Sequence, residues 1–208
     1  MKAFFPAVTP ALILLLFLTA CSDSPQPSAE KAEAVKPPEP VTGLTAIYAM
    51  YNMARQWAPD IQVLSARSLR LGEVETRGGK SGAWEVTFVS ASRSSARTYT
   101  YSIIEGPGNL HKGVFGGLAE SYSGPRGQER PFPINVVRTD TDKAYEIAMK
   151  KGDYYAREHP KLPIFFLLEL TPRHTDPVWR VVWGESVATS GFSILINSAT
   201  GEHVQTLR

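Results

Sequence analysis

The four histidines are the first residues to test for chemistry, because histidine serves both as a general base and as a metal ligand. They lie far apart in the sequence, and no HExxH motif, HxH pair or pair of cysteines accompanies them. The chain also lacks a Gly-x-Ser-x-Gly elbow, a Walker loop and a Gly-x-Gly-x-x-Gly turn. We therefore expect no catalytic constellation, no metal and no cofactor around His111, His159, His174 and His203.

Three acidic residues stand out by their positions. Glu169 lies inside an apolar run, so it is either a buried acid with a raised pKa or the ion-pair partner of a residue such as Arg180 on a neighbouring strand. Glu73 and Glu75 flank a predicted hairpin before Gly78. For Glu169 a solvated position at a sheet edge or such an ion pair is the simpler interpretation.

A connection rich in glycine and proline, residues 105–135, is the strongest candidate for an interaction site. Structureless connections of about 30 residues are uncommon in compact domains and are either functional or mobile. Aromatic residues and arginine, which this segment contains, are enriched at protein interfaces. The alternative is a linker that packs across a sheet edge. We expect the partner-binding residues to be Tyr122, Arg126 and Arg130.

The amino terminus has the order of a secretory signal, with Lys2, an apolar segment at 11–18 and small residues before Cys21. The apolar segment is shorter than the roughly 20 residues that a membrane span needs. Leu18-Thr19-Ala20-Cys21 resembles the lipobox of bacterial lipoproteins, which implies lipid transfer to the Cys21 thiol and cleavage before it. The alternatives are a signal peptide with an incidental cysteine or a cysteine awaiting a disulfide partner. Ser22 after the cysteine favours the outer membrane over the inner membrane by analogy with lipoprotein sorting.

Composition divides the rest of the chain. Residues 21–41 are rich in Pro, Ser, Ala, Glu and Lys and poor in large apolar residues, so we expect a disordered tether after a signal peptide at 1–20. The chain has 22 Lys and Arg against 20 Asp and Glu, with no basic run. This balance gives no support for a nucleic-acid partner.

The same succession of elements occurs twice in the remaining sequence. Each half has an amphipathic stretch that ends in Ala-Arg, then a proline, an apolar strand and a Trp-x-Val strand, which begins at Trp84 or Trp179. Alternating patterns and short turns favour antiparallel sheets. The sequence predicts an α+β fold of two tandem units, each a helix plus a three-stranded antiparallel sheet, at 42–117 and 139–208, joined by a connecting loop at 118–138.

The end of the chain resembles the PepSY domain. The resemblance rests on Trp-Arg-Val-Val-Trp at 179–183, Phe-Ser-Ile-Leu-Ile-Asn at 192–197 and Ala-Thr-Gly-Glu-His-Val at 199–204. It extends from the helix at 142–159 to the end, and the first half is a degenerate copy. Asn197 replaces the usual Asp, and 105–108 departs from the pattern.

The resemblance implies a small module that is not an enzyme and that inhibits or regulates a partner. Together with the lipobox, it predicts a lipid-anchored, periplasm-facing lipoprotein that binds or inhibits an envelope protein or peptidase. The protein would attach to the membrane through the lipid on Cys21. A structural component of the envelope and an enzyme of unrecognised type stay open as alternatives.

Overall fold

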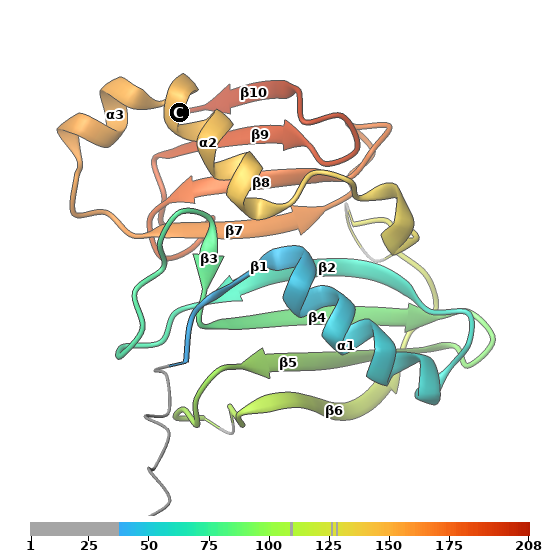
Figure 1. Cartoon of the computed structure of the whole chain (residues 1–208). Helices are drawn as coiled ribbons and strands as arrows, with labels where there is room; N and C mark the ends of the chain where they lie inside the picture. Colours follow the sequence, from blue (N-terminus) through green and yellow to red (C-terminus); the bar gives the residue numbers. More distant parts are fainter. Residues whose placement is uncertain (1–37, 109, 126, 128) are drawn as a thin grey trace, which may run out of the picture. The chain divides into compact units, whose positions relative to one another are not determined.

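An eight-stranded antiparallel sheet forms the centre of the domain, and helices cover one of its faces (Figure 1). The structure is a computed structural model that describes residues 38–208 except 109, 126 and 128. The strand order is β10-β9-β8-β7-β2-β4-β5-β6, and a separate short ladder joins β1 to β3. The elements of the first half are β1 (Val41–Thr42), α1 (Gly43–Trp57), β2 (Gln62–Leu69), β3 (Lys80–Ser81), β4 (Ala83–Ser90), β5 (Ser95–Ser102) and β6 (Gly113–Ser121). Those of the second half are η1 (Ile134–Val136), α2 (Thr141–Lys151), α3 (Asp153–Glu158), β7 (Ile164–Glu169), β8 (Val178–Trp183), β9 (Phe192–Asn197) and β10 (His203–Leu207).

The predicted α+β class is confirmed, but each half contributes four strands to the sheet rather than three. In the first half the additional strand is β6, which runs across residue 118, where the sequence predicted that the connecting loop begins. Its three glycines make the segment a poor candidate for a strand by sequence, because glycine is depleted in strands. Gly116 is needed for packing, since a Cβ there would lie 2.8 Å from the Tyr99 ring.

The two predicted units share one continuous sheet. Strands β2 and β7 pair in antiparallel fashion at its middle, and strands of each half follow outward in chain order. Helix α1 packs mainly on β4 and β5, whereas α2 packs on β8 and β9. One apolar core therefore extends under both helices.

The two tryptophans singled out in the sequence meet in that core. Trp84 and Trp179 are fully buried, and their rings make an edge contact at 6.4 Å. Each is the second residue of its strand, and each indole N–H donates to a carbonyl just before a helix, at Val41 (3.1 Å) or Thr139 (2.8 Å). The two positions are equivalent, as the sequence predicted; an origin by duplication stays a prediction.

The beginning of α1 is capped by residues of the other half. Thr42, the N-cap residue, makes no side-chain cap hydrogen bond. Instead Gly43 N–H donates to Thr141 Oγ1 at 2.8 Å, and Leu44 N–H donates to Asp140 Oδ1 at 2.9 Å. Thr141 Oγ1 donates in turn to the Gly79 carbonyl at 2.6 Å. The first N–H groups of a helix have no partners within the helix. Residues of the second half accept from those of α1, so this network joins the two halves.

The second predicted helix, 142–159, is divided at Gly152 into α2 and α3. A Cβ at Gly152 would lie 3.0 Å from Phe192 and 3.1 Å from Ile194, so the chain approaches the sheet closely there. After the break, the Tyr155 ring stacks on Phe192 with centroids 4.2 Å apart. The helical pattern alone contained no signal for this change of direction.

Candidate functional site: a groove at the end of the central strands

A groove of about 930 Å³ opens at the end of the sheet where β2 finishes and β7 begins. The connection after β2, residues 70–76, forms one wall, and residues 160–163 before β7 form the other. Residues from both halves therefore line it, and Gly184 and Glu185 after β8 complete it. In Figure 1 these connections lie at the left end of the sheet.

The groove exists because the pairing between β2 and β7 does not extend to the last residues of β2 or to the first residues of β7. Their ladder contains three residue pairs and stops at Arg67 and Leu167, although β2 continues to Leu69 and β7 begins at Ile164. At the end of the ladder, Phe166 N–H donates to the side-chain oxygen of Ser68 at 3.0 Å. The two strands diverge beyond this point and form the inner end of the groove.

The wall that follows β2 is held by its own small core. Leu71 packs with Ala83, Ile103 and Leu110 in a second apolar cluster. Leu71 also forms an isolated bridge with Val74, whose N–H donates to the Leu71 carbonyl at 3.3 Å. This wall is therefore an ordered part of the fold.

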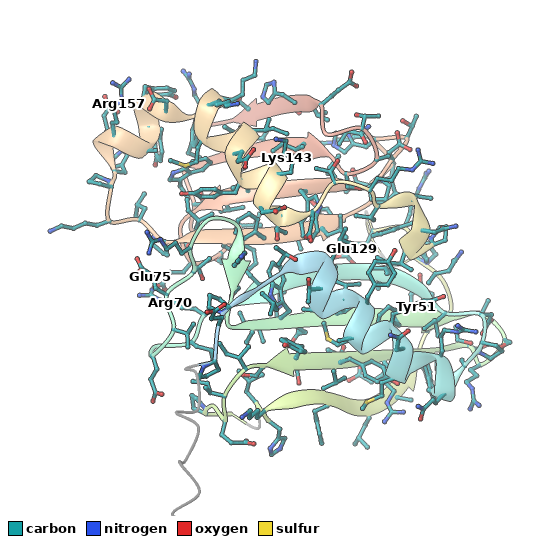
Figure 2. The ribbon with its side chains drawn as sticks, viewed as in Figure 1. Tyr51, Arg70, Glu75, Glu129, Lys143 and Arg157 are labelled. Carbon is teal, nitrogen blue, oxygen red and sulfur yellow. The ribbon has the colours of Figure 1, made fainter. Side chains whose placement is uncertain are left out.

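The lining of the groove combines balanced charges with apolar side chains. Arg70 forms an ion pair with Glu185, and Arg67 forms one with Glu85 at 2.7 Å. Figure 2 labels Arg70 and Glu75, two of the lining residues, at the left of the view. The charged lining residues are Arg67, Arg70 and Lys161 against Glu73, Glu75 and Glu185, and the apolar ones are Leu69, Leu71, Val74, Leu162, Ile164 and Phe165.

Tyr122 and Arg130, the predicted loop residues that the structure describes, are not among the residues that line this groove. Tyr122 follows β6 and is half-buried, and its N–H donates to the Ser94 carbonyl at 2.9 Å. Its hydroxyl is buried without a hydrogen-bond partner among the described residues, and burial, followed by the charge of Glu129, raises its pKa. Arg130 is exposed and its N–H donates to the Leu170 carbonyl at 2.8 Å. Arg126 lies outside the described residues.

Another aromatic residue of the same segment, Phe132, belongs to the core. It is 2% exposed and exchanges two backbone hydrogen bonds of 2.9 Å with Val63. The segment between β6 and η1 is thus tied to the sheet at its far end. The role of Tyr122, Arg126 and Arg130 in partner binding stays a prediction.

Of the interpretations that the sequence left open for Glu169, the structure supports a buried acid with a raised pKa. Burial raises the pKa of its carboxyl group, the charge of Arg180 opposes that rise, and Glu129 adds to it. The residue lies at the end of β7, beside Val178 and Ser65 on the neighbouring strands. It lies outside the groove lining.

The histidines stay apart in the structure. His111 lies 3.4 Å from a carboxylate oxygen of Glu105, and the His159 ring packs on Tyr155. His203 Nε2 lies 3.1 Å from Thr206 Oγ1, and burial, followed by Lys151, lowers its pKa. Within the described ranges, no group of three or more His, Cys, Asp or Glu residues could hold a metal ion.

The sequence interpretation missed the groove, although one signal pointed to it. Glu73 and Glu75 were assigned to a simple hairpin, whereas hairpin loops usually have about two to five residues. The stretch from Arg70 to Gly82, which joins the paired strands β2 and β4 and includes β3, is longer than that. Its excess length was the sign of an additional structural feature.

The chain matches no family model, and no curated protein matches it. Among solved structures it is similar to a crystal structure described as a putative lipoprotein from Clostridium difficile 630, with a TM-score of 0.46 and 10% sequence identity, over 77% of this chain and 91% of that chain.

The lipidation residue expected from the sequence, Cys21, lies outside the described residues. In the part of the chain that the structure describes, no helix is long and apolar enough to cross a membrane.

Proposed function

We propose that the protein is a lipid-anchored, non-catalytic module of the bacterial cell envelope that binds another envelope protein or a peptidase through the groove between its halves. The groove is the observation that supports this proposal best. Its volume lies within the range of roughly 300–1,000 Å³ that is usual for ligand pockets. Its lining combines apolar side chains with charged groups of both signs.

The envelope location rests on the sequence. The lipobox-like segment would place lipid on Cys21, and Ser22 would direct the protein to the outer membrane, facing the periplasm. The proline-rich residues 21–41 would then hold the folded domain away from the lipid surface. The PepSY-like pattern of the second half supports a regulatory or inhibitory effect on the partner.

Photo-crosslinking in cells tests the groove as the contact surface. A crosslinking amino acid at Glu75, an exposed groove residue, should trap a discrete partner band. The same group at Lys150, an exposed residue of α2, is the matched control and should not. A third position, Arg130, tests the loop that the sequence favoured.

The pattern of bands decides between the surfaces. A discrete band from Glu75 alone supports the groove. A band from Arg130 but not from Glu75 would move the binding surface to the loop. Bands of equal strength from Glu75 and Lys150, or no band from any of the three positions, would contradict the proposed function.

A further inference from the structure

The direction of the main-chain N–H and C=O groups at the end of β2 and at the start of β7 indicates which class of ligand the groove can bind. We propose that the groove takes an extended polypeptide segment of the partner, whose main chain pairs with the free strand edges at Arg70 and Ile164. This inference rests on the proposed function, because it names the chemical class of the partner at the same site.

Two hydrogen bonds establish which way the β7 edge faces. Successive residues of an antiparallel strand direct their N–H and C=O groups to opposite neighbours. The Pro163 carbonyl accepts from Gly184 N–H at 2.8 Å, so Pro163 faces the β8 side. Ile164, the next residue, therefore directs its main-chain groups toward β2, as does Phe166, whose N–H reaches Ser68.

The β2 edge faces the same space. The Leu69 carbonyl accepts from Ser81 Oγ at 3.0 Å, on the side of β3 and β4. If the alternation of β2 continues through Arg70, the first residue after the strand, its main-chain groups face β7. Continuing the register of the ladder would place Arg70 opposite Ile164, but the ladder ends at Arg67 and Leu167. Both residues line the groove.

A strand edge that faces an open groove is suited to β-strand addition. In that mode, main-chain hydrogen bonds supply affinity, and pockets for alternate side chains supply selectivity. Here Leu69, Leu162 and Phe165 line the space beside the two edges. The lining contains three basic and three acidic residues, so its net charge favours neither an acidic nor a basic segment.

A peptide titration tests this inference on the full chain purified in detergent. The probe is a fluorescent, uncharged eight-residue peptide in which valine alternates with threonine. A second peptide has the same sequence with every backbone amide N-methylated, which removes the donors on both edges of the strand. We expect the first peptide to bind and the methylated one to bind at least tenfold more weakly, measured by fluorescence anisotropy.

Two leucine variants locate the binding. Leu162→Asp places a charge in the groove lining and should weaken binding at least tenfold. Leu118→Asp changes a leucine that is 90% exposed on β6, outside the groove, and should leave binding unchanged. The methylated peptide needs no variant, so a folding defect in Leu162→Asp would not conceal the result.

Specific outcomes would overturn the inference. Equal binding of the two peptides would exclude main-chain pairing, and equal weakening by both Asp variants would exclude the groove. Absence of binding by the unmethylated peptide would also overturn it. Displacement of the probe by a synthetic copy of residues 22–37 at lower concentration than by the unlabelled probe would assign the groove to this chain's own tether. A crosslink from Glu75 together with equal binding of the two peptides would leave the proposed function standing without this ligand class.

Discussion

Asp60 joins the loop after α1 to the turn between β4 and β5. Its carboxylate accepts hydrogen bonds from Ser90 Oγ at 2.6 Å, Ser92 N–H at 2.8 Å and Ser92 Oγ at 2.9 Å. These bonds, that of Ser90 first, hold the pKa of Asp60 at about 2, below its ordinary value of 3.8. Hydrogen bonds to the charged form favour that form, so the folded state keeps Asp60 ionised.

The sign of the resulting pH dependence follows from the lowered pKa. The folded state binds this proton less readily than the unfolded state, so the stabilisation is complete above about pH 4. It is lost as the pH falls toward 2. We predict that Asp60→Asn has a lower unfolding temperature than the wild type at pH 6, measured by circular dichroism. This difference in unfolding temperature should become smaller at pH 2. Ser90→Ala should act in the same direction. A constant difference from pH 6 to pH 2 would refute this assignment.

At the scale of elements, the starts of α1 and α2 and the strands β4 and β8 form one joint. The indole donors of Trp84 and Trp179 fix the chain just before each helix. Thr141 and Asp140 then supply acceptors to the first N–H groups of α1. The positions of both helices on the sheet therefore depend on contacts between residues that are far apart in sequence.

We predict that Trp84→Phe and Trp179→Phe destabilise the fold to similar extents. Each leaves a carbonyl, at Val41 or Thr139, without its indole donor, which costs about 1–3 kcal/mol. Chemical denaturation of the two variants measures the effects side by side. A large loss in one variant and none in the other would show that the two positions are not energetically equivalent.

The elements that the sequence predicted share one property: their signals are local. The alternation of Trp84, Val86 and Phe88 identifies β4 because its buried face repeats every second residue. By contrast, β6 was missed because it contains three glycines, and the reason for one of them, Gly116, is the Tyr99 ring on the neighbouring strand β5. The break at Gly152 likewise depends on Phe192.

The groove was missed for the same reason. It depends on where β2 and β7 part, a contact between strands separated by about 100 residues in the chain, and the bond from Phe166 N–H to Ser68 that ends the ladder has no sequence pattern. The sequence drew attention to Glu73 and Glu75 but did not show which residues lie around them in the groove.

At the scale of the whole molecule, the proposed function needs both an anchor and a folded binding domain. The binding groove lies within residues 67–185, whereas the proposed anchor is at Cys21, before the proline-rich tether. A single acyl chain gives only marginal membrane binding, and stable anchoring takes two signals. Processing of a lipobox would supply the necessary chains at one residue.

We predict that Cys21→Ser removes the protein from the membrane fraction or blocks its maturation, because Cys21 is the only cysteine in the chain. Fractionation of cells, with immunoblotting of pellet and supernatant, measures the distribution, and incorporation of labelled palmitate measures lipidation. Ser24→Ala, three residues away, is the matched control and should behave as the wild type. A Cys21→Ser protein that is processed normally and still sediments with membranes would exclude a lipid anchor at this residue.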